Sequence, residues 1–156
     1  MPNIAPRPEY SYQYCKPHDV ASDELISASN KIDTFGIIAP LINSKINLNY
    51  KLIDKKIKPD LENPFKVRSV DGFAMLLNVK KLNQIDSFKN FKFFDENIFL
   101  YLEEIDLCRR LQKLNKKVYI VPSIKVEHLG GKSHNPIYSD QMELQRNWHY
   151  MWSLFY

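Results

Sequence analysis

The chain has 156 residues, of which 44% are hydrophobic and 26% are charged, and its formal net charge is +4. This length and composition predict one soluble globular domain and exclude a disordered chain. Because the lysines are scattered along the chain, the positive charge favours a nucleic-acid partner only weakly.

Other classes of protein are excluded by what the sequence lacks. With four glycines and no repeated period, it contains neither a glycine-rich phosphate loop nor a repeat architecture. Residues 1–14 lack the apolar core of a signal peptide, and no segment approaches the roughly 20 apolar residues that span a membrane. Cys15 and Cys108 lie far apart without metal-type spacing, which favours a reduced, cytoplasmic protein.

The first half of the chain predicts one helix, one buried strand and a long loop. Residues 1–21 contain four prolines and no sustained hydrophobic period, so an irregular segment is expected there. Ser22 can cap a short helix, and the inner face of that helix would carry Leu25, Ile26 and Ser29. The apolar run at 35–41 predicts a buried strand ended by a proline, and the polar residues 42–66 predict a surface loop.

The second half of the chain predicts alternating strands and helices. Residues 67–79 resemble a central strand with a break at Asp71-Gly72, and residues 80–93 a connector with one turn of helix. The remaining elements are a helix at 103–115 with Leu107, Leu111 and Leu114 on its buried face, strands at 117–121 and 124–129 separated by a Pro-Ser turn, and a helix at 140–156. This alternation predicts an α/β fold. The aromatic end of the last helix needs a cover, so the chain is expected to be part of a larger domain.

Carboxylates are most concentrated at the start of the helix at 103–115, where Glu103, Glu104 and Asp106 fall in the first turn. Negative charge there gains about 0.3–1 kcal/mol from the helix dipole. Ordinary capping, with Asp106 paired to an arginine one turn on, therefore explains these acids without a function. The functional alternative is that one of them points into a cleft as a general base.

His128 follows Glu104 by 24 residues, and this spacing allows the two to meet. A helix of about 12 residues climbs roughly 18 Å, and a returning strand of five or six residues covers roughly 17–20 Å. The chain can therefore return to the level of Glu104 before it delivers His128. A hydrogen-bonded structural histidine is the alternative, although the glycine-containing turn at 129–134 suits anion binding.

Three further features have structural alternatives of their own. Asp71-Gly72 and Asp95-Glu96 can be simple turns or caps, and the aromatic stripe at 148–152 is more typical of packing than of base stacking. No serine lies on a nucleophile-type elbow, so a Ser-His-Asp triad is not indicated.

Four segments gain specificity from their order along the chain. They are Phe35–Pro40, Val70–Leu77, Phe94–Arg110, and Val121-Pro122 followed by His128–Ser133. In this order they resemble the C-terminal half of the family 2 glycosyltransferases, especially the bacterial rhamnosyltransferase-like branch. The third segment is similar to the family pattern F-D-E followed by E-D-x-D-L-x-x-R, and the last is similar to V-P followed by H-x-G-G-x-S. The resemblance runs from about Ser22 to the end of the chain.

The resemblance implies a partial GT-A (Rossmann-like) nucleotide-diphospho-sugar transferase fold over residues 22–156, with a mixed sheet flanked by helices. It also implies inverting sugar transfer, in the cytoplasm or at the inner face of a membrane with peripheral association, during synthesis of a cell-wall or surface polysaccharide. The donor would be a nucleotide diphosphate-sugar such as dTDP-rhamnose, and the acceptor a saccharide or a lipid-linked molecule. A divalent metal, Mg²⁺ or Mn²⁺, would balance the departing diphosphate.

The resemblance further assigns roles to individual residues. Glu104, with Glu103 beside it, occupies the general-base position, where Glu replaces the usual Asp. His128 falls where some members supply a metal ligand. Substrate contacts would come from Asp71, Gly72, Gly130, Gly131, Lys132 and Ser133, and structural support from Asp106 and Arg110.

The family's N-terminal nucleotide-binding half has no counterpart here, and only Asp19 could be a remnant of its metal motif. The sequence is therefore interpreted as a truncated transferase, which alone would bind nucleotide poorly and be inactive. Two other interpretations stay open. The chain is a non-catalytic remnant or interaction domain, or, less favoured, a basic nucleic-acid module.

Overall fold

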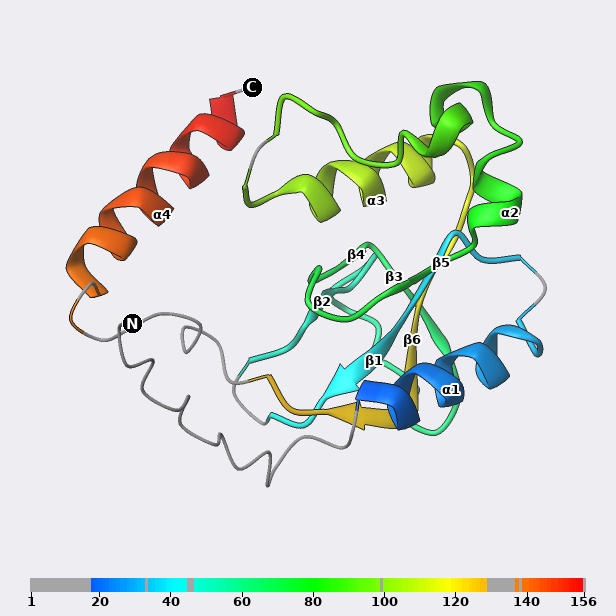
Figure 1. Cartoon of the computed structure of the whole chain (residues 1–156). Coiled ribbons are helices and arrows are strands. Elements are labelled where there is room, and N and C mark those ends of the chain that lie inside the picture. Colours follow the sequence, from blue (N-terminus) through cyan, green and yellow to red (C-terminus); the bar gives the residue numbers. More distant parts are fainter. Residues whose placement is uncertain are drawn as a thin grey trace, which may run out of the picture.

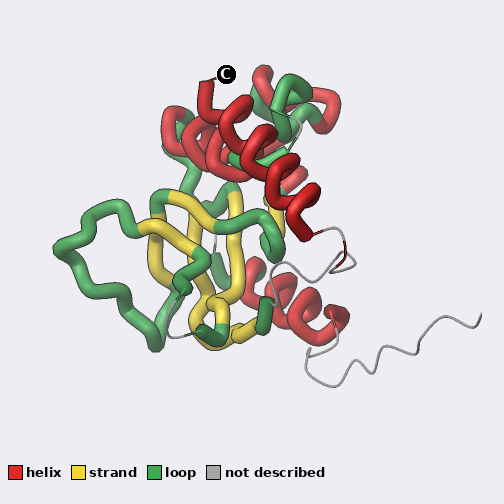
Figure 2. Tube along the Cα trace, turned by 90° about the vertical axis from the view of Figure 1, so that its left-hand side faces the viewer, coloured by secondary structure: helices red, strands yellow, loops and turns green. Residues whose placement is uncertain are grey.

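The computed structural model describes residues 18–32, 34–44, 47–98, 100–128, 137 and 139–155. A mixed sheet lies between helices on its two faces (Figure 1). Helix α1 (His18–Ser29) covers one face and helix α3 (Glu103–Lys113) covers the other, an arrangement also visible in Figure 2. The predicted α/β class, with a mixed sheet flanked by helices, is confirmed.

The main sheet has the strand order β3–β6–β1–β5, and a second sheet pairs β2 with β4. The strands are β1 (Ile37–Ile42), β2 (Tyr50–Lys51), β3 (Phe65–Val67), β4 (Ser69–Val70), β5 (Leu76–Leu77) and β6 (Val118–Val126). Strands β1 and β6 are parallel, whereas β3 and β5 join the edges in the antiparallel direction. The carboxyl ends of β1 and β6 therefore share one edge of the sheet, which is where open α/β folds commonly bind ligands.

Strand β1 is central because side chains on both of its faces are buried. Ile37 and Ala39 pack in one core with Leu107 of α3, and Ile38 packs in the other core with Leu25 of α1. A strand covered on both faces has a continuous apolar sequence. This explains why the strand could be predicted from the sequence at 35–41.

Prolines lie inside both central strands and do not end them. Pro40 lies in β1 and Pro122 in β6, and the pairing register of the two strands shifts between Pro40 and Leu41. Such a bulge accommodates a residue that cannot donate a backbone hydrogen bond. The predicted Pro-Ser turn at 122–123 is wrong, because β6 continues through it.

The predicted central strand at 67–79 is also wrong. The chain leaves β3 at Val67, forms the two residues of β4, turns at 71–74, and returns as β5 at the edge of the sheet. The apolar side chains of residues 73–75 and 77 are only partly buried because they line a cleft, described below, instead of filling the centre of the sheet.

The predicted loop at 42–66 contains β2 and the first residues of β3, and residues 52–64 form a projecting loop (Figure 2). Asn49 ties the start of this region to β1. Its buried amide donates to the Pro40 carbonyl over 2.9 Å, and its side-chain oxygen accepts from the Ile42 N–H over 3.0 Å. A buried amide with both functions satisfied carries little desolvation penalty.

The N-terminal helix is confirmed, but it begins at His18, four residues before the predicted cap. The described residues 18–21 therefore correct part of the irregular segment predicted at 1–21, while residues 1–17 lie outside the described ranges. Leu25 is buried as predicted, whereas Ile26 is 51% exposed and does not face the core. Ser29 caps the turn locally, since its hydroxyl donates to the Ile26 carbonyl over 2.6 Å.

The connector and the two later helices are confirmed. Helix α2 (Val79–Leu82) and the 3₁₀ helix η1 (Asp86–Phe91) form the connector, and α4 (Ser139–Phe155) is the last helix. In α3 the residues Leu107 and Leu111 are buried, but Leu114 follows the last helical residue and is 39% exposed. No helix in the described part of the chain combines the length and hydropathy needed to cross a membrane.

Candidate functional site

Helix α3 begins immediately after two residues with left-handed backbone conformation. Tyr101 has φ 65° and Leu102 has φ 70°, and Leu102 caps the helix without a side-chain hydrogen bond. A non-glycine residue in this conformation costs about 1–3 kcal/mol, and such strain is concentrated at functional sites. The strained pair places Glu103 and Glu104 in the first turn, as the sequence predicted.

Glu104 lies against the turn that follows β4. A β-carbon built on Gly72 would lie 3.5 Å from Cβ and 3.6 Å from Cγ of Glu104, so the glycine leaves room for this side chain. Burial raises the pKa of Glu104, and the neighbouring carboxylates of Glu103 and Asp71 raise it further. A hydrogen bond from the Glu104 backbone N–H and the charge of Lys51 oppose this rise.

Asp71 and Lys51 complete a group of interacting charges around Glu104. Burial raises the pKa of Asp71, whereas the charges of Lys51 and His128 lower it. Lys51 ends β2 and Asp71 follows β4, and these two strands are paired, so the small sheet holds the two side chains beside α3. A carboxylate whose pKa is raised toward neutrality suits a proton acceptor.

His128 comes two residues after β6 and stacks on Phe73. The two ring centroids are 4.3 Å apart and the ring planes differ by 7°. The stack holds the imidazole near the turn that carries Asp71 and Gly72. The charge of His128 lowers the pKa of Asp71, and Asp71 in turn raises the pKa of Glu104. A direct approach of His128 to Glu104 stays a prediction.

A cleft of about 610 Å³ opens beside this group, at the carboxyl end of the parallel strand pair. Its wall is formed by the start of α1, the turn after β4 and the end of β6, including Gly72, Phe73 and His128. We name this the main cleft.

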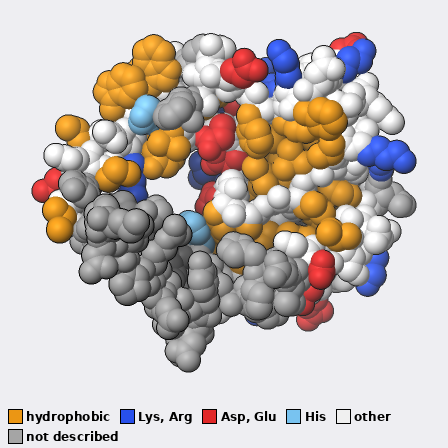
Figure 3. All heavy atoms as spheres, viewed as in Figure 1, with side chains coloured by type: hydrophobic (Ala, Val, Ile, Leu, Met, Phe, Trp, Pro, Cys, Tyr) orange, Lys and Arg blue, Asp and Glu red, His pale blue; other side chains and the backbone are white. Residues whose placement is uncertain are grey.

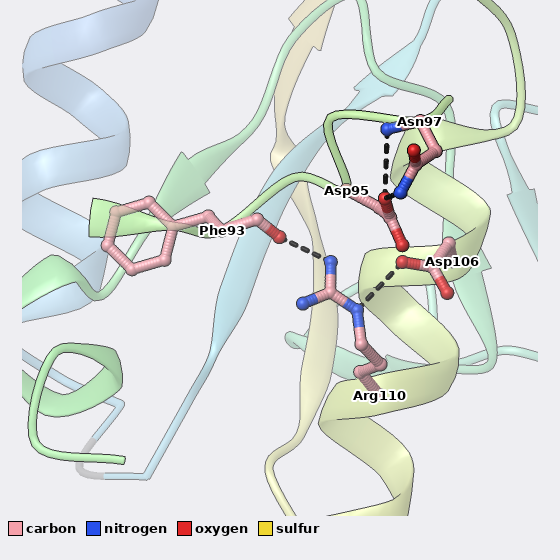
Figure 4. Close-up of polar contacts among 5 residues, drawn as sticks. All are labelled: Phe93, Asp95, Asn97, Asp106 and Arg110. Carbon is pink, nitrogen blue, oxygen red and sulfur yellow. Dashed lines mark hydrogen bonds and ion pairs between the residues drawn. The ribbon is translucent and has the colours of Figure 1, made fainter. Parts of the chain in front are cut away.

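Asp106 and Arg110 form an ion pair one turn apart on α3. The Arg110 Nε donates to Asp106 over 2.7 Å, and another guanidinium nitrogen of Arg110 donates to the Phe93 carbonyl (Figure 4). The guanidinium carbon also lies 4.9 Å from the centre of the Phe88 ring. Arg110 therefore fastens the segment before α3 to the helix and is not directed to the main cleft.

Glu103 differs from Glu104 in its surroundings. Its Oε2 atom is buried, and no described residue offers it a hydrogen bond. A buried carboxylate oxygen without a partner is costly, and such a group often has a ligand or a functional role. Glu103 therefore stays a candidate beside Glu104.

Two predictions concern a metal ligand, His128, and an anion-binding turn at 130–133. Within the described ranges no group of three His, Cys, Asp or Glu side chains is arranged to hold a metal ion, and His128 is not part of one. Gly130, Gly131, Lys132 and Ser133 lie outside the described residues.

Two residues of the site were not identified from the sequence. Lys51 lies in a lysine-rich loop region whose pairing partner could not be recognised, and Phe73 was assigned to a strand core. The sequence signal for Phe73 was its position directly after Asp71-Gly72. Lys51 had no comparable signal. Comparison of the chain with family models, with curated proteins and with solved structures finds no match.

Proposed function

We propose that the chain carries the acceptor-activating half of an inverting sugar transferase, with Glu104 as the general base. The base would remove the proton of an acceptor hydroxyl while the acceptor oxygen bonds to the anomeric carbon of the sugar. The bond from that carbon to the diphosphate would break, which releases the nucleoside diphosphate. Asp71 and Gly72 would contact substrate in the main cleft, and Glu103 would assist Glu104. The donor class, including dTDP-rhamnose, and the saccharide or lipid-linked acceptor remain part of this proposal.

The observation that carries the proposal is the position of Glu104. Its carboxylate is partly buried at the start of α3, beside Asp71 and Lys51 and next to the main cleft, and its pKa is raised. A solvated capping residue would lie away from other carboxylates and would keep an ordinary pKa. The strained backbone before it is a second sign that the geometry is maintained for a purpose other than stability.

A divalent metal, Mg²⁺ or Mn²⁺, stays a prediction of the same proposal. It would supply positive charge for the departing diphosphate. His128 is the described residue that would contribute a ligand, and the described residues around it do not form a complete metal site. None of the chemistry assigned to Glu104 depends on that ion.

The proposal is tested by product formation in a version of the chain that is joined to an N-terminal nucleotide-binding half. We expect release of the nucleoside diphosphate from a nucleotide diphosphate-sugar in the presence of an acceptor. Glu104→Gln should lower this rate by about 10²–10⁴-fold, the usual contribution of general base catalysis. Glu143→Gln, on α4, is the matched control. Equal rates for all three proteins would reject Glu104 as the base.

A non-catalytic interaction domain is the second candidate, and the exposed face of α4 favours it. Trp148, Met151, Trp152 and Phe155 are each at least half exposed, and hydrophobic atoms gather at this end of the molecule in Figure 3. Exposed apolar surface of this kind commonly marks an interface. Calorimetric titration with nucleoside diphosphates and Mn²⁺ separates the candidates, because metal-dependent micromolar binding would exclude a purely non-catalytic domain.

A further inference from the structure

A second cleft, of about 370 Å³, lies on the side of α3 that faces α4. Its residues come from four separate parts of the chain: the end of β2, the loop before α3, one face of α3 and the last turns of α4. The hydroxyl of Ser153 donates to the Leu100 carbonyl over 3.0 Å and attaches α4 at this point. We name this the α3–α4 cleft.

The carboxylates in the wall of the α3–α4 cleft are already engaged. Asp106 accepts a hydrogen bond from Arg110 over 2.7 Å. Asp95 accepts two hydrogen bonds from Asn97, one from its backbone N–H and one from its side-chain amide, each over 2.9 Å (Figure 4). These bonds lower the pKa of Asp95, so it is an anion that already has its partners.

The two basic side chains in the same wall, Lys51 and Arg109, have no direct salt-bridge or hydrogen-bond partner among the described residues. Lys51 acts electrostatically on Glu104 and Asp71, but no described carboxylate forms a salt bridge with its ammonium group or with the Arg109 guanidinium. The nitrogen donors of both side chains can therefore bond an anionic ligand, and charge-assisted hydrogen bonds are the strong ones.

The remaining wall is apolar or aromatic and fits the body of an organic molecule. Ile105 and Leu154 line it from α3 and α4, and Tyr150 contributes a ring with a hydroxyl. A mixture of apolar surface with a few convergent polar groups is typical of small-molecule sites. A cleft meant only for inorganic ions would not need this surface.

Lys51 connects this cleft to the general base. It lines the α3–α4 cleft, and its charge also acts on Glu104 and Asp71, which lie beside the main cleft. Glu104 is therefore linked to both clefts, through its contact with Gly72 of the main cleft and through the charge of Lys51. A transferase needs two substrates to meet at its base, and the two clefts provide one place for each.

We propose that the α3–α4 cleft binds the phosphate group of a phosphorylated acceptor, with Lys51 and Arg109 as the residues that contact the phosphate. This inference rests on the proposed function for the identity of the ligand as an acceptor. The phosphate belongs either to a free sugar phosphate or to a lipid-linked diphosphate, because both present the same group. Arginine and lysine are the side chains that bind phosphate best.

The test is direct binding by calorimetry, with the chain as it stands and three probes: glucose 1-phosphate, farnesyl diphosphate and uncharged glucose. Lys51→Met and Arg109→Met should each weaken binding of both phosphorylated probes by on the order of tenfold. Lys113→Met is the matched control, because Lys113 is exposed on α3 but does not line the cleft. It should leave the affinity unchanged, and glucose should not bind.

A ¹⁵N spectrum of the Arg109 guanidinium gives an independent readout if Lys51→Met does not fold. The Arg109 Nε–H signal should shift when glucose 1-phosphate is added and should not shift with glucose. Tighter binding of farnesyl diphosphate would identify a lipid-linked diphosphate as the ligand. Tighter binding of glucose 1-phosphate would identify a free sugar phosphate. Both results support a phosphate site.

Three results would overturn the inference: no binding of either phosphorylated probe, equal loss of affinity in Lys113→Met, or no effect of both substitutions in the cleft. The experiment measures binding and not turnover. A failure here therefore leaves Glu104 as a candidate base, and an inactive Glu104 does not affect the binding result.

Discussion

The side chain of Glu104 lies against the backbone of Gly72, with only 3.5 Å between Cβ of Glu104 and the position that a β-carbon on residue 72 would take. That distance is an ordinary van der Waals contact, so a methyl group fits beside Glu104. The contact joins the first turn of α3 to the turn after β4, and it places a potential base beside the main cleft.

Substitution of Gly72 should therefore depend on size. We expect Gly72→Ala to fold with unchanged stability or a gain of about 0.4–1 kcal/mol, because alanine restricts the unfolded chain. Gly72→Leu should lose about 1–3 kcal/mol, because its side chain must displace Glu104. Urea unfolding of the two variants measures the difference, and equal stabilities would show that Glu104 does not occupy this position.

Gly36 provides the opposite case. A β-carbon there would lie 3.0 and 3.1 Å from the two methyl carbons of Leu111, which is tighter than an ordinary van der Waals contact, so Leu111 would have to shift. We expect Gly36→Ala to lose about 1–3 kcal/mol through overpacking and Leu111→Ala about 2–5 kcal/mol through a cavity. The double variant should lose less than the sum, because each change relieves the other. Strict additivity in denaturant unfolding would contradict the predicted contact.

Removal of the Arg110 guanidinium should loosen the segment before α3. Arg110→Met breaks the hydrogen bonds to Asp106 and to the Phe93 carbonyl, and we expect a loss of about 1.5–3 kcal/mol in the free energy of unfolding. Arg109→Met, one residue earlier on the exposed side of the helix, should change the stability by less than about 0.5 kcal/mol. Similar losses in both variants would mean that helix propensity, and not these bonds, sets the effect.

Cys108 should be chemically inert in the folded protein. Its side chain is fully buried, and burial raises the pKa of the thiol to about 11. Since the thiolate is the reactive form, iodoacetamide at pH 8 should leave Cys108 unmodified until the chain unfolds. Peptide mapping by mass spectrometry with and without urea checks this. Rapid modification without urea would place Cys108 at the surface.

The main elements could be predicted because their sequences carry one dominant signal. Strand β1 has a continuous apolar run, and α3 combines acids in its first turn with leucines at helical spacing. The stretch at 67–79 was wrongly predicted as one strand because the apolar residues at 73–75 and 77 line the main cleft. A cleft wall of this kind has the same composition as a buried strand. The sequence also predicted that Pro40 ends a strand and that Pro122 begins a turn. In the structure both prolines lie inside strands, because a bulge in the pairing of β1 with β6 accommodates them.

The candidate site could be predicted only where its residues belong to recognisable segments. Glu104 stands at a helix start and Asp71 at a turn, so both were identified from the sequence. Lys51 comes from a two-residue strand in a polar region, and its position depends on pairing with β4, which no local pattern indicates. The stacking of Phe73 on His128 joins residues 55 positions apart and likewise needs the fold.

The pH dependence of stability should carry a signature of Glu104. Its pKa in the folded state is raised above the ordinary 4.5, mainly by burial. Below pH 4.5 the group is protonated in both states, and as the pH rises through the folded-state pKa, ionisation in a partly buried place destabilises the fold. Glu104→Gln should therefore melt at a higher temperature than the parent protein at pH 7 and at a similar temperature at pH 3.5. A lower melting temperature at pH 7 would contradict this.

The carboxyl pKa of Glu104, measured by ¹³C NMR titration, tests the central claim most directly, because that claim joins Glu104, Asp71 and Lys51 in one site. We expect a pKa above 4.5 in the parent chain, a lower value in Asp71→Asn, where a neighbouring negative charge is removed, and a higher value in Lys51→Met, where a positive charge is removed. A pKa of 4.5 that neither substitution changes would show that Glu104 is a solvated helix cap and not the base of an active site.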